Sequence, residues 1–355
     1  MGSDTPTPFD TEAHRQRAEQ SYQRVQPQYE ALAQAIKDIL SDAFGTVSVK
    51  VASIEARAKT IESFGRKATE PADADETQPK YPEPLKQITD LAGVRVITFL
   101  PREIDYIDQI IAREFNIVER LDKRDILVRE ERFGYQSLHF LVKLKPTRTR
   151  LPEYSRFDQL IAEIQVRTIL QHAWAEIEHD IQYKSVETIP TVIRRRFMVL
   201  AGLLELADRE FQAVQDEDQR LRKVARLSID AGKLADVEIT PDSLKAYLDK
   251  TLGADGRMRY YDQTAFDLKR YGFRNLQQVA DAVGKYDGDQ LSRDVYGGRM
   301  GQLGRFELML LAALGDRLIG ANPFGRYDWW REGRLRELRK MREAGIETGT
   351  YKLEE

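Results

Sequence analysis

Hydrophobic and polar positions follow two different periods along this chain. Over residues 10–44 the apolar side chains recur every three or four residues, which predicts one or two amphipathic helices. From residue 45 the period is two in "TVSVKVASIEA", "AGVRVITFL", "NIVERLDKR", "LHFLVKL" and "FDQLIAEIQVRT", which predicts strands. Helical patterns lie between and after them in "TIESFGRKA", "PREIDYIDQIIAREF" and "ILQHAWAEIEHDIQYK". The middle of the chain is therefore predicted to be α/β (α+β), a mixed sheet flanked by helices.

The same patterns suggest four parts. They are an N-terminal helical region over 1–44, the mixed domain over 45–190, a long helical connector over 191–229 and a smaller, mostly helical domain over 230–355. In the last part, Thr240 and Pro241 mark a helix start and Gly253 its end. The polar, proline-rich segment "TEPADADETQPKYPEP" predicts a loop.

Composition excludes several classes of function. The chain has 355 residues, 41% of them apolar, and a net charge of −3, so any attraction to nucleic acid must come from a local patch. It contains no cysteine, which excludes disulfides, thiolate metal sites and a cysteine nucleophile. Neither a signal-peptide h-region nor a run of about 18 apolar residues is present, so we expect a soluble, cytoplasmic protein without a membrane partner.

Polar residues concentrate in the middle domain. A cationic segment comes first, Asp90 and Arg95 flank a buried strand, and Glu163, Gln165 and Arg167 alternate on one face of another strand. The cationic segment comprises Arg57, Lys59, Ser63, Arg66 and Lys67. Several cations with two separate carboxylates suit phosphoryl or pyrophosphoryl transfer, because cations neutralise a polyphosphate and carboxylates hold Mg²⁺ or accept a proton. The P-loop pattern G-x-x-x-x-G-K-[ST] is absent, which excludes that class.

Each feature also has an ordinary structural explanation. A strand-edge glutamate beside arginine is usually a surface ion pair. His172 and His179, seven residues apart on an apolar helix, are more often packing or capping residues than ligands. Tyr135 could be a core residue. Residue types and spacing alone therefore predict a nucleotide enzyme and go no further.

Four segments in order, "RAKTIESFGRK", "ITDLAGVRVI", "FGYQSLHF" and "AEIQVRTILQHAWAEIEHDIQYK", resemble the RelA/SpoT alarmone synthetase family. The resemblance covers about residues 45–190 and implies a nucleotidyltransferase-like fold. It also implies Mg²⁺-dependent transfer of the β,γ-pyrophosphate of ATP to a ribose 3′-hydroxyl, most simply that of GDP or GTP to make (p)ppGpp. His14 stands alone in its helix, so we expect no His-Asp hydrolase domain.

Carried over to this sequence, the resemblance assigns a role to each polar residue. Asp90 and Glu163 would be catalytic and would hold Mg²⁺, with Glu163 acting on the 3′-hydroxyl. The ATP phosphates would be bound by Arg57, Lys59, Ser63, Lys67 and Arg95. The acceptor would be bound by Tyr135, which stacks on its base, and by His139, Gln165 and Arg167.

The acceptor remains open at this stage. Phe133 stands where the family usually has asparagine, and acidic Glu130 and Glu131 precede it. With its C-terminal extension, the chain also resembles the toxic small alarmone synthetases, some of which pyrophosphorylate the tRNA 3′-CCA end and are restrained by a fused antitoxin-like domain until a phage protein engages it. A third hypothesis is an inactive nucleotide sensor, which the presence of both Asp90 and Glu163 argues against.

The C-terminal segments "RMRYYDQTAFDLKRYGF" and "NPFGRYDWWREGRLRELRKMR" are rich in aromatic and cationic residues. The aromatic residues are Tyr260, Tyr261, Tyr327, Trp329 and Trp330, and the cations are Arg331, Arg334, Arg336, Arg339 and Arg342. The aromatics are typical of a small domain core, and arginines alternating with glutamates are typical of a solvated helix. The alternatives are a tRNA-binding patch and a tyrosine that blocks the ATP site.

Overall fold

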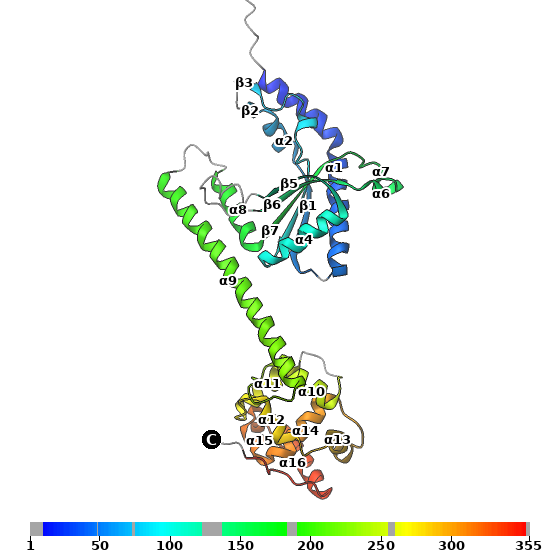
Figure 1. Cartoon of the computed structure of the whole chain (residues 1–355), viewed down its shortest axis with the longest axis vertical. Coiled ribbons are helices and arrows are strands. Elements are labelled where there is room, and N and C mark those ends of the chain that lie inside the picture. Colours follow the sequence, from blue (N-terminus) through cyan, green and yellow to red (C-terminus); the bar gives the residue numbers. More distant parts are fainter. Residues whose placement is uncertain are drawn as a thin grey trace, which may run out of the picture. The chain divides into compact units, whose positions relative to one another are not determined.

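A computed structural model describes residues 10–47, 49–72, 75–122, 137–182, 190–254 and 260–352. The chain divides into two compact units, Met1–Val214 and Gln215–Glu355. Figure 1 shows a mixed α/β arrangement in the first and helices in the second. The predicted mixed α/β fold with a mostly helical C-terminal region is therefore confirmed.

A five-stranded sheet forms the centre of the first unit, in the order β1-β4-β7-β6-β5. β4 and β7 run parallel, and the other neighbours are antiparallel. The strands are β1 (Val51–Ala58), β4 (Ala92–Thr98), β5 (Phe115–Asp122), β6 (Leu138–Leu144) and β7 (Ala162–Thr168). The sequence predicted all five, although β7 begins later than expected because the short helices α6 (Pro146–Thr149) and α7 (Pro152–Ser155) and a turn precede it.

The two faces of this sheet differ in chemistry, because successive side chains of a strand point to opposite faces. One face packs in a core with α1 (Thr11–Val47) and α4 (Pro101–Glu114). Its strand residues include Val94, Val96, Phe140, Val142, Ile164 and Val166, all fully buried. The other face presents the polar residues between them, so one strand pattern provides both a core and a polar surface.

The first helix anchors the region before β4. α1 is a single helix that contains Pro27, and its buried Tyr22 stacks on Phe64 of α2 (Ile61–Ala68) with ring centroids 4.5 Å apart. Tyr22 Oη donates to the Lys59 carbonyl over 2.8 Å, and the Thr60 side chain caps α2. These contacts fix the chain where β1 leads into α2.

The proline-rich segment after α2 was predicted as a loop, and that prediction was wrong in part. It contains a two-stranded antiparallel sheet of β2 (Pro71–Ala72) and β3 (Asp75–Pro79), followed by α3 (Pro84–Gln87). Lys80 N donates to the Glu70 carbonyl over 2.8 Å and closes the open end of this pair. Backbone pairing here outweighs the local preference for a turn.

Two long helices follow the sheet. In α8 (Ile169–Gln182), Trp174 packs on Phe197 of α9 (Thr191–Asp230), with ring centroids 5.0 Å apart. The buried Asp208 of α9 accepts a 2.7 Å hydrogen bond from Thr168 Oγ1 at the end of β7. The division between the units falls at Val214, inside α9, whereas the sequence pattern suggested a boundary near residue 230.

The second unit is helical. Its helices are α10 (Pro241–Leu252), α11 (Tyr261–Arg270), α12 (Leu276–Val283), α13 (Gly288–Tyr296), α14 (Gln302–Leu314), α15 (Asp316–Ala321), the 3₁₀ helix η3 (Pro323–Arg326) and α16 (Asp328–Glu343). Thr240 caps α10 and Gly253 ends it, as predicted. α14 supplies most of its apolar side chains to the core. Among the described residues, no helix is long and apolar enough to cross a membrane.

The predicted aromatic residues of this unit fall into two groups. Tyr261 is fully buried in the core, and the half-buried Trp330 packs against it. Tyr260, Tyr327 and Trp329 are exposed. The prediction of a small domain core is therefore correct for two of them only.

Candidate functional site

A pocket of about 230 Å³ opens on the polar face of the sheet. Strand register places Arg57, Gly93 and Glu163 in one row across β1, β4 and β7, and Glu55, Arg95 and Gln165 in the next. We call this the sheet pocket; it is lined by Glu55, Ala56, Arg57, Lys59, Asp90, Gly93, Val94, Arg95, Glu163 and Gln165. At the centre of the first row Gly93 has no side chain, which keeps the space between Arg57 and Glu163 open.

Asp90 lies just before β4 and holds two lysines together. Its Oδ2 accepts from Lys59 Nζ at 2.8 Å and from Lys67 Nζ at 3.0 Å. Burial alone would raise the pKa of Asp90, but the hydrogen bonds and charges of Lys59 and Lys67 outweigh it and hold this pKa below its ordinary value. Asp90 is therefore an anion, and one of its oxygens is already neutralised.

The position of this cluster comes from α1. Tyr22 Oη donates to the backbone carbonyls of Lys59 and, over 3.4 Å, of Leu91, and Gln26 Nε2 also donates to the Lys59 carbonyl over 3.0 Å. Lys59 N donates to the Leu91 carbonyl over 2.9 Å. The backbones on either side of the lysine–aspartate contact are thus joined to each other and to one buried tyrosine.

A chain of hydrogen bonds crosses β6 and β7. Glu163 Oε1 lies 2.7 Å from His139 Nδ1, and its Oε2 accepts from Gln165 Nε2 at 2.9 Å. Gln165 Oε1 accepts from Arg167 Nη2 at 2.8 Å, and His139 Nε2 lies 2.6 Å from Ser137 Oγ. Both ring nitrogens of His139 are therefore engaged, and Glu163 is held through both oxygens.

This chain of hydrogen bonds keeps Glu163 ionised. Burial alone would raise the pKa of Glu163, but the hydrogen bond and charge of His139, with Gln165, outweigh it and bring the pKa below its ordinary value. Because the ionised carboxylate only accepts hydrogen bonds, His139 donates to it from Nδ1. Asp90 acts on Glu163 in the opposite direction, since two neighbouring anions repel.

Positive charge is concentrated beside the two carboxylates. Arg95 pairs with Glu176 of α8 at 2.9 Å. Burial lowers the pKa of Arg167, and the charges of Arg95 and Arg57 act in the same direction. Arginines this close together repel unless an anion lies among them, so the face favours binding of a polyanion.

Most of the predicted site residues meet here. Arg57, Lys59, Asp90, Arg95, Glu163 and Gln165 line the sheet pocket, and Lys67 joins it through Asp90. His139 and Arg167 belong to the hydrogen-bond chain, and the Ser63 amide is used in capping α2. Tyr135 lies outside the described residues.

Sequence reasoning did not identify three further residues of this region. Glu55 lines the sheet pocket, Ser137 supports His139, and Glu176 pairs with Arg95. The period-two pattern of β1 places Glu55 on the same face as Arg57 and could have identified it. Nothing in the sequence pairs Glu176 with a residue 81 positions away.

The residues fit a magnesium ion in one respect. Asp90 Oδ1 is buried and has no hydrogen-bond partner among the described residues, and a carboxylate oxygen is a ligand that Mg²⁺ prefers. The described part of the chain contains no group of three or more His, Cys, Asp or Glu that could hold a metal. A Mg²⁺ ion would thus depend on one or two carboxylates together with substrate phosphates, which is usual for this ion.

Fold and pocket define an α/β domain whose sheet presents two carboxylates among clustered cations. Residues 56–188 match the family described as "Region found in RelA / SpoT proteins". Two similar proteins of Bacillus subtilis (strain 168) are GTP pyrophosphokinase YjbM and GTP pyrophosphokinase YwaC, each 28% identical over 38% of this chain and 61% of their own. This segment of the chain therefore matches the RelA/SpoT family, which confirms the resemblance of the four motifs.

Solved structures are similar over a longer stretch. The small alarmone synthetase 1 from Bacillus subtilis is 22% identical and covers 56% of this chain and 98% of its own, with a TM-score of 0.47. A GTP pyrophosphokinase family protein from Streptococcus pneumoniae is 21% identical and covers 56% of this chain and 95% of its own, with a TM-score of 0.46. The chain spans 61% of the length of the curated relatives that it matches.

Proposed function

We propose that this protein is a pyrophosphokinase that transfers the β,γ-pyrophosphate of ATP to a ribose 3′-hydroxyl. The observation that carries the proposal is the meeting of Asp90 and Glu163 with clustered cations on one open sheet face. The match of residues 56–188 to the RelA/SpoT family and the similarity to two proteins named GTP pyrophosphokinase support the same chemistry.

The cations bind the ATP polyphosphate in this proposal. Arg57, Lys59 and Arg95 line the pocket, and Lys67 and Ser63 lie on the adjoining α2. Charge spreads over the phosphoryl oxygens as the bond to the departing AMP breaks, and fixed cations stabilise that charge. Asp90 would hold Mg²⁺ through Oδ1, with Glu163 as the second carboxylate near it, and the ion would add positive charge at the polyphosphate.

Glu163 serves as the proton acceptor for the 3′-hydroxyl. Its two oxygens are held by His139 and Gln165, so the carboxylate is oriented before substrate binds. The lowered pKa keeps it ionised, and a further lone pair on each oxygen remains for the incoming hydroxyl. In this arrangement His139 acts as a positioning residue for Glu163 rather than as a contact to the acceptor's phosphates.

The acceptor we favour is GDP or GTP, which would yield (p)ppGpp. Gln165 and Arg167 extend from Glu163 along β7 and would form the acceptor side, with Tyr135 stacking on the base. The alternative acceptor is the tRNA 3′-CCA end, with the C-terminal unit acting as a restraint released by a phage protein. An inactive nucleotide sensor is the third hypothesis.

One experiment separates these acceptors. Purified full-length protein is incubated with γ-³²P-ATP, Mg²⁺ and GDP, GTP or bulk tRNA, and the labelled products are resolved. Label in a guanosine nucleotide supports the favoured acceptor, and label in tRNA alone supports the alternative. Absence of transfer to every acceptor, with ATP binding retained, would support the sensor and contradict the proposal.

A further inference from the structure

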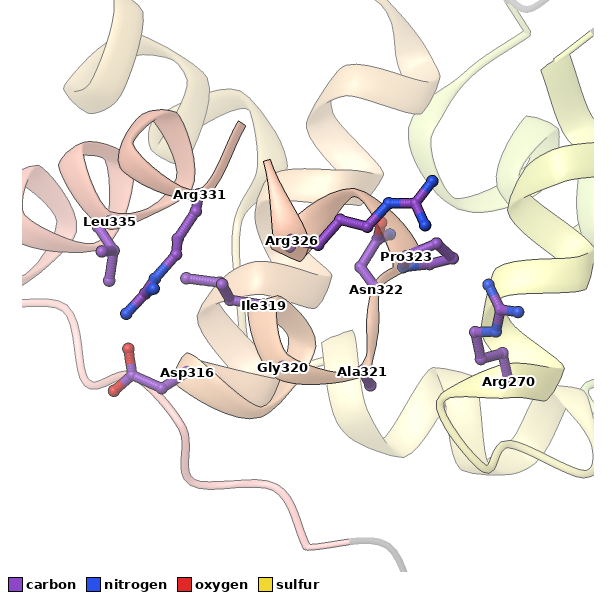
Figure 2. A pocket seen from close by; sticks show the side chains of 11 residues that line it. Arg270, Asp316, Ile319, Gly320, Ala321, Asn322, Pro323, Arg326, Arg331 and Leu335 are labelled. Atoms are coloured by element: carbon purple, nitrogen blue, oxygen red, sulfur yellow. The ribbon is translucent and has the colours of Figure 1, made fainter. Parts of the chain in front are cut away.

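A second pocket lies wholly within the unit Gln215–Glu355 and takes no part in the proposed transfer. Its volume is about 830 Å³, which suits a ligand of nucleotide size, since small-molecule sites span roughly 300–1,000 Å³. The end of α11, α15, η3 and the start of α16 form it (Figure 2). We call it the arginine pocket, after Arg270, Arg326 and Arg331, which line it with Asp316, Ile319 and Leu335.

The charge of this pocket is unbalanced. The lining contains three arginines and one aspartate, a formal excess of two positive charges. Asp316 has a cation outside the pocket lining, because its Oδ2 lies 3.5 Å from Arg342 Nη2. Within the described ranges, none of the three arginines forms an ion pair with a carboxylate. Anions from solution are therefore the natural counter-charge.

Aromatic rings orient two of these guanidinium groups without neutralising them. Arg326 donates from Nη2 to Tyr327 Oη over 2.8 Å, and its Cζ lies 4.8 Å from the Tyr327 ring centroid. Arg270 Cζ lies 5.3 Å from the Phe266 ring centroid. A cation on an aromatic face keeps its N–H groups available for a ligand.

The backbone that carries the arginines is fixed. Asn322 donates from Nδ2 to Tyr271 Oη over 2.5 Å, which joins the start of η3 to the residue after Arg270. Asn322 Oδ1 also accepts from Phe324 N at 2.9 Å. A Cβ at Gly325 would lie 2.1 Å from the Ile319 carbonyl oxygen, so η3 and α15 pack backbone to backbone. Such a frame lowers the entropy cost of holding a ligand.

The pocket is also asymmetric. Figure 2 shows Arg270 and Arg326 on the side of Pro323, whereas Arg331 extends toward Asp316 near Leu335 and Ile319. One side is thus purely cationic, and the other combines an apolar surface with one arginine and one carboxylate. A polyphosphate fits the first side, and a sugar or flat base with hydrogen-bonding edges fits the second.

We propose that the arginine pocket binds a nucleoside polyphosphate, with its phosphates between Arg270 and Arg326 and its nucleoside beside Ile319, Leu335 and Asp316. Guanidinium groups suit this ligand because their planar N–H pairs match two phosphate oxygens at once. The volume accommodates a single nucleotide, whereas single-stranded nucleic acid is bound along grooves of about 4–16 nucleotides.

Equilibrium dialysis of full-length protein with GTP alone tests the proposal, since no transfer occurs without a second substrate. A variant carrying Arg270→Ala, Arg326→Ala and Arg331→Ala is compared with one carrying Arg293→Ala, Arg336→Ala and Arg339→Ala. The second removes the same charge at exposed positions of the same unit outside the pocket. We expect the first variant to bind one GTP per chain fewer, or to bind that GTP at least tenfold more weakly. The GTP affinity of the second variant should change less than twofold.

The outcomes also separate this proposal from the proposed function. If the sheet pocket binds GTP as well, the number bound falls from two to one; if it does not, the number falls from one to zero. Equal binding by the two triple variants would overturn the proposal. Arg326→Lys keeps the charge and loses the planar pair of N–H donors. Its GTP affinity should therefore lie between those of the wild type and the first triple variant.

Two competing ligands test the nucleoside part. Inorganic tripolyphosphate should compete at least tenfold less well than GTP, because it leaves the apolar side empty. Equal competition would overturn recognition of a nucleoside. Displacement of GTP by single-stranded RNA at tenfold lower concentration would overturn the small-ligand assignment in favour of nucleic acid. Unchanged thermal unfolding of the variants shows that each is folded.

Discussion

The two pockets of this chain both contain arginines but differ in the carboxylates beside them. In the sheet pocket, cations surround two partly buried carboxylates, each held by hydrogen bonds. In the arginine pocket, three guanidinium groups and a single exposed carboxylate line the cavity. Cations alone can hold a polyphosphate, but transfer also needs a group that takes a proton and one that positions an ion. In these two proposals the carboxylates, rather than the cations, distinguish a reaction site from a binding site.

The largest effect should come from Glu163→Gln. The amide keeps the shape of the side chain and cannot accept a proton, so kcat for pyrophosphate transfer should fall by about 10² to 10⁴. ATP affinity and GTP binding in the arginine pocket should stay within about twofold. Steady-state transfer assays with dialysis measure both.

Glu55→Gln is the matched control for that change. Glu55 lines the same pocket and makes no contact with His139. We expect its kcat to change less than fivefold. If the two variants lost equal activity, general loss of negative charge would explain the result and the role of Glu163 would be wrong.

Asp90→Asn should come next, with a loss of about 100-fold in kcat/KM for ATP. The change removes the charge that separates Lys59 from Lys67, which then repel, and it weakens the ligand expected for Mg²⁺. Titrating activity against Mg²⁺ should show a higher requirement. An unchanged Mg²⁺ requirement would remove Asp90 from the ion's site.

Removing the histidine that holds Glu163 should have a smaller effect with a distinct pH signature. In His139→Ala the hydrogen bond that lowers the pKa of Glu163 is lost while its burial remains, so this pKa should rise. The wild-type acid limb of kcat/KM should lie below the ordinary glutamate value of about 4.3 and move upward in the variant, with about tenfold lower activity at pH 7.

His172→Ala is the control for this experiment. Its Nδ1 lies 3.8 Å from Glu176 and has no hydrogen-bond partner among the described residues. The acid limb should therefore stay in place. A shift of equal size in both variants would contradict a specific contact between His139 and Glu163.

The smallest effect should be Tyr22→Phe, which changes stability rather than chemistry. The variant loses the hydroxyl that joins α1 to the carbonyls of Lys59 and Leu91, at a cost of about 1 kcal/mol in the free energy of unfolding. Denaturant unfolding measures it. Tyr29→Phe, at a neighbouring tyrosine whose hydroxyl has no such bond to any described residue, should be nearly neutral; equal losses would contradict the anchoring role.

The sequence predicted the part of the site that depends on local period. Alternation in β7 placed Glu163, Gln165 and Arg167 on one face, and strand register confirms it. The contact between His139 and Glu163 could not be predicted from spacing, because it depends on the register of β6 against β7. The arginine pocket was missed for a similar reason, since its arginines come from three separate elements.

The fold was predicted best where burial is one-sided. β6 matches its predicted bounds of 138–144, because its apolar side chains alternate cleanly. The segment that contains β2 and β3 was predicted as a loop for the opposite reason. Its prolines and acidic residues are typical of a loop, and the two short strands form by pairing with each other. Weak local preference leaves such segments to tertiary contacts.

Gln165 gives the hydrogen-bond chain a direction. Its Nε2 donates to Glu163 Oε2 and its Oε1 accepts from Arg167 Nη2, and the planar amide holds this donor and this acceptor side by side. Glutamate there would set a second anion against Glu163, and lysine would meet Arg167 with a second cation. Exchange of Gln165 for either residue would therefore lose one of its two hydrogen bonds and place like charges side by side.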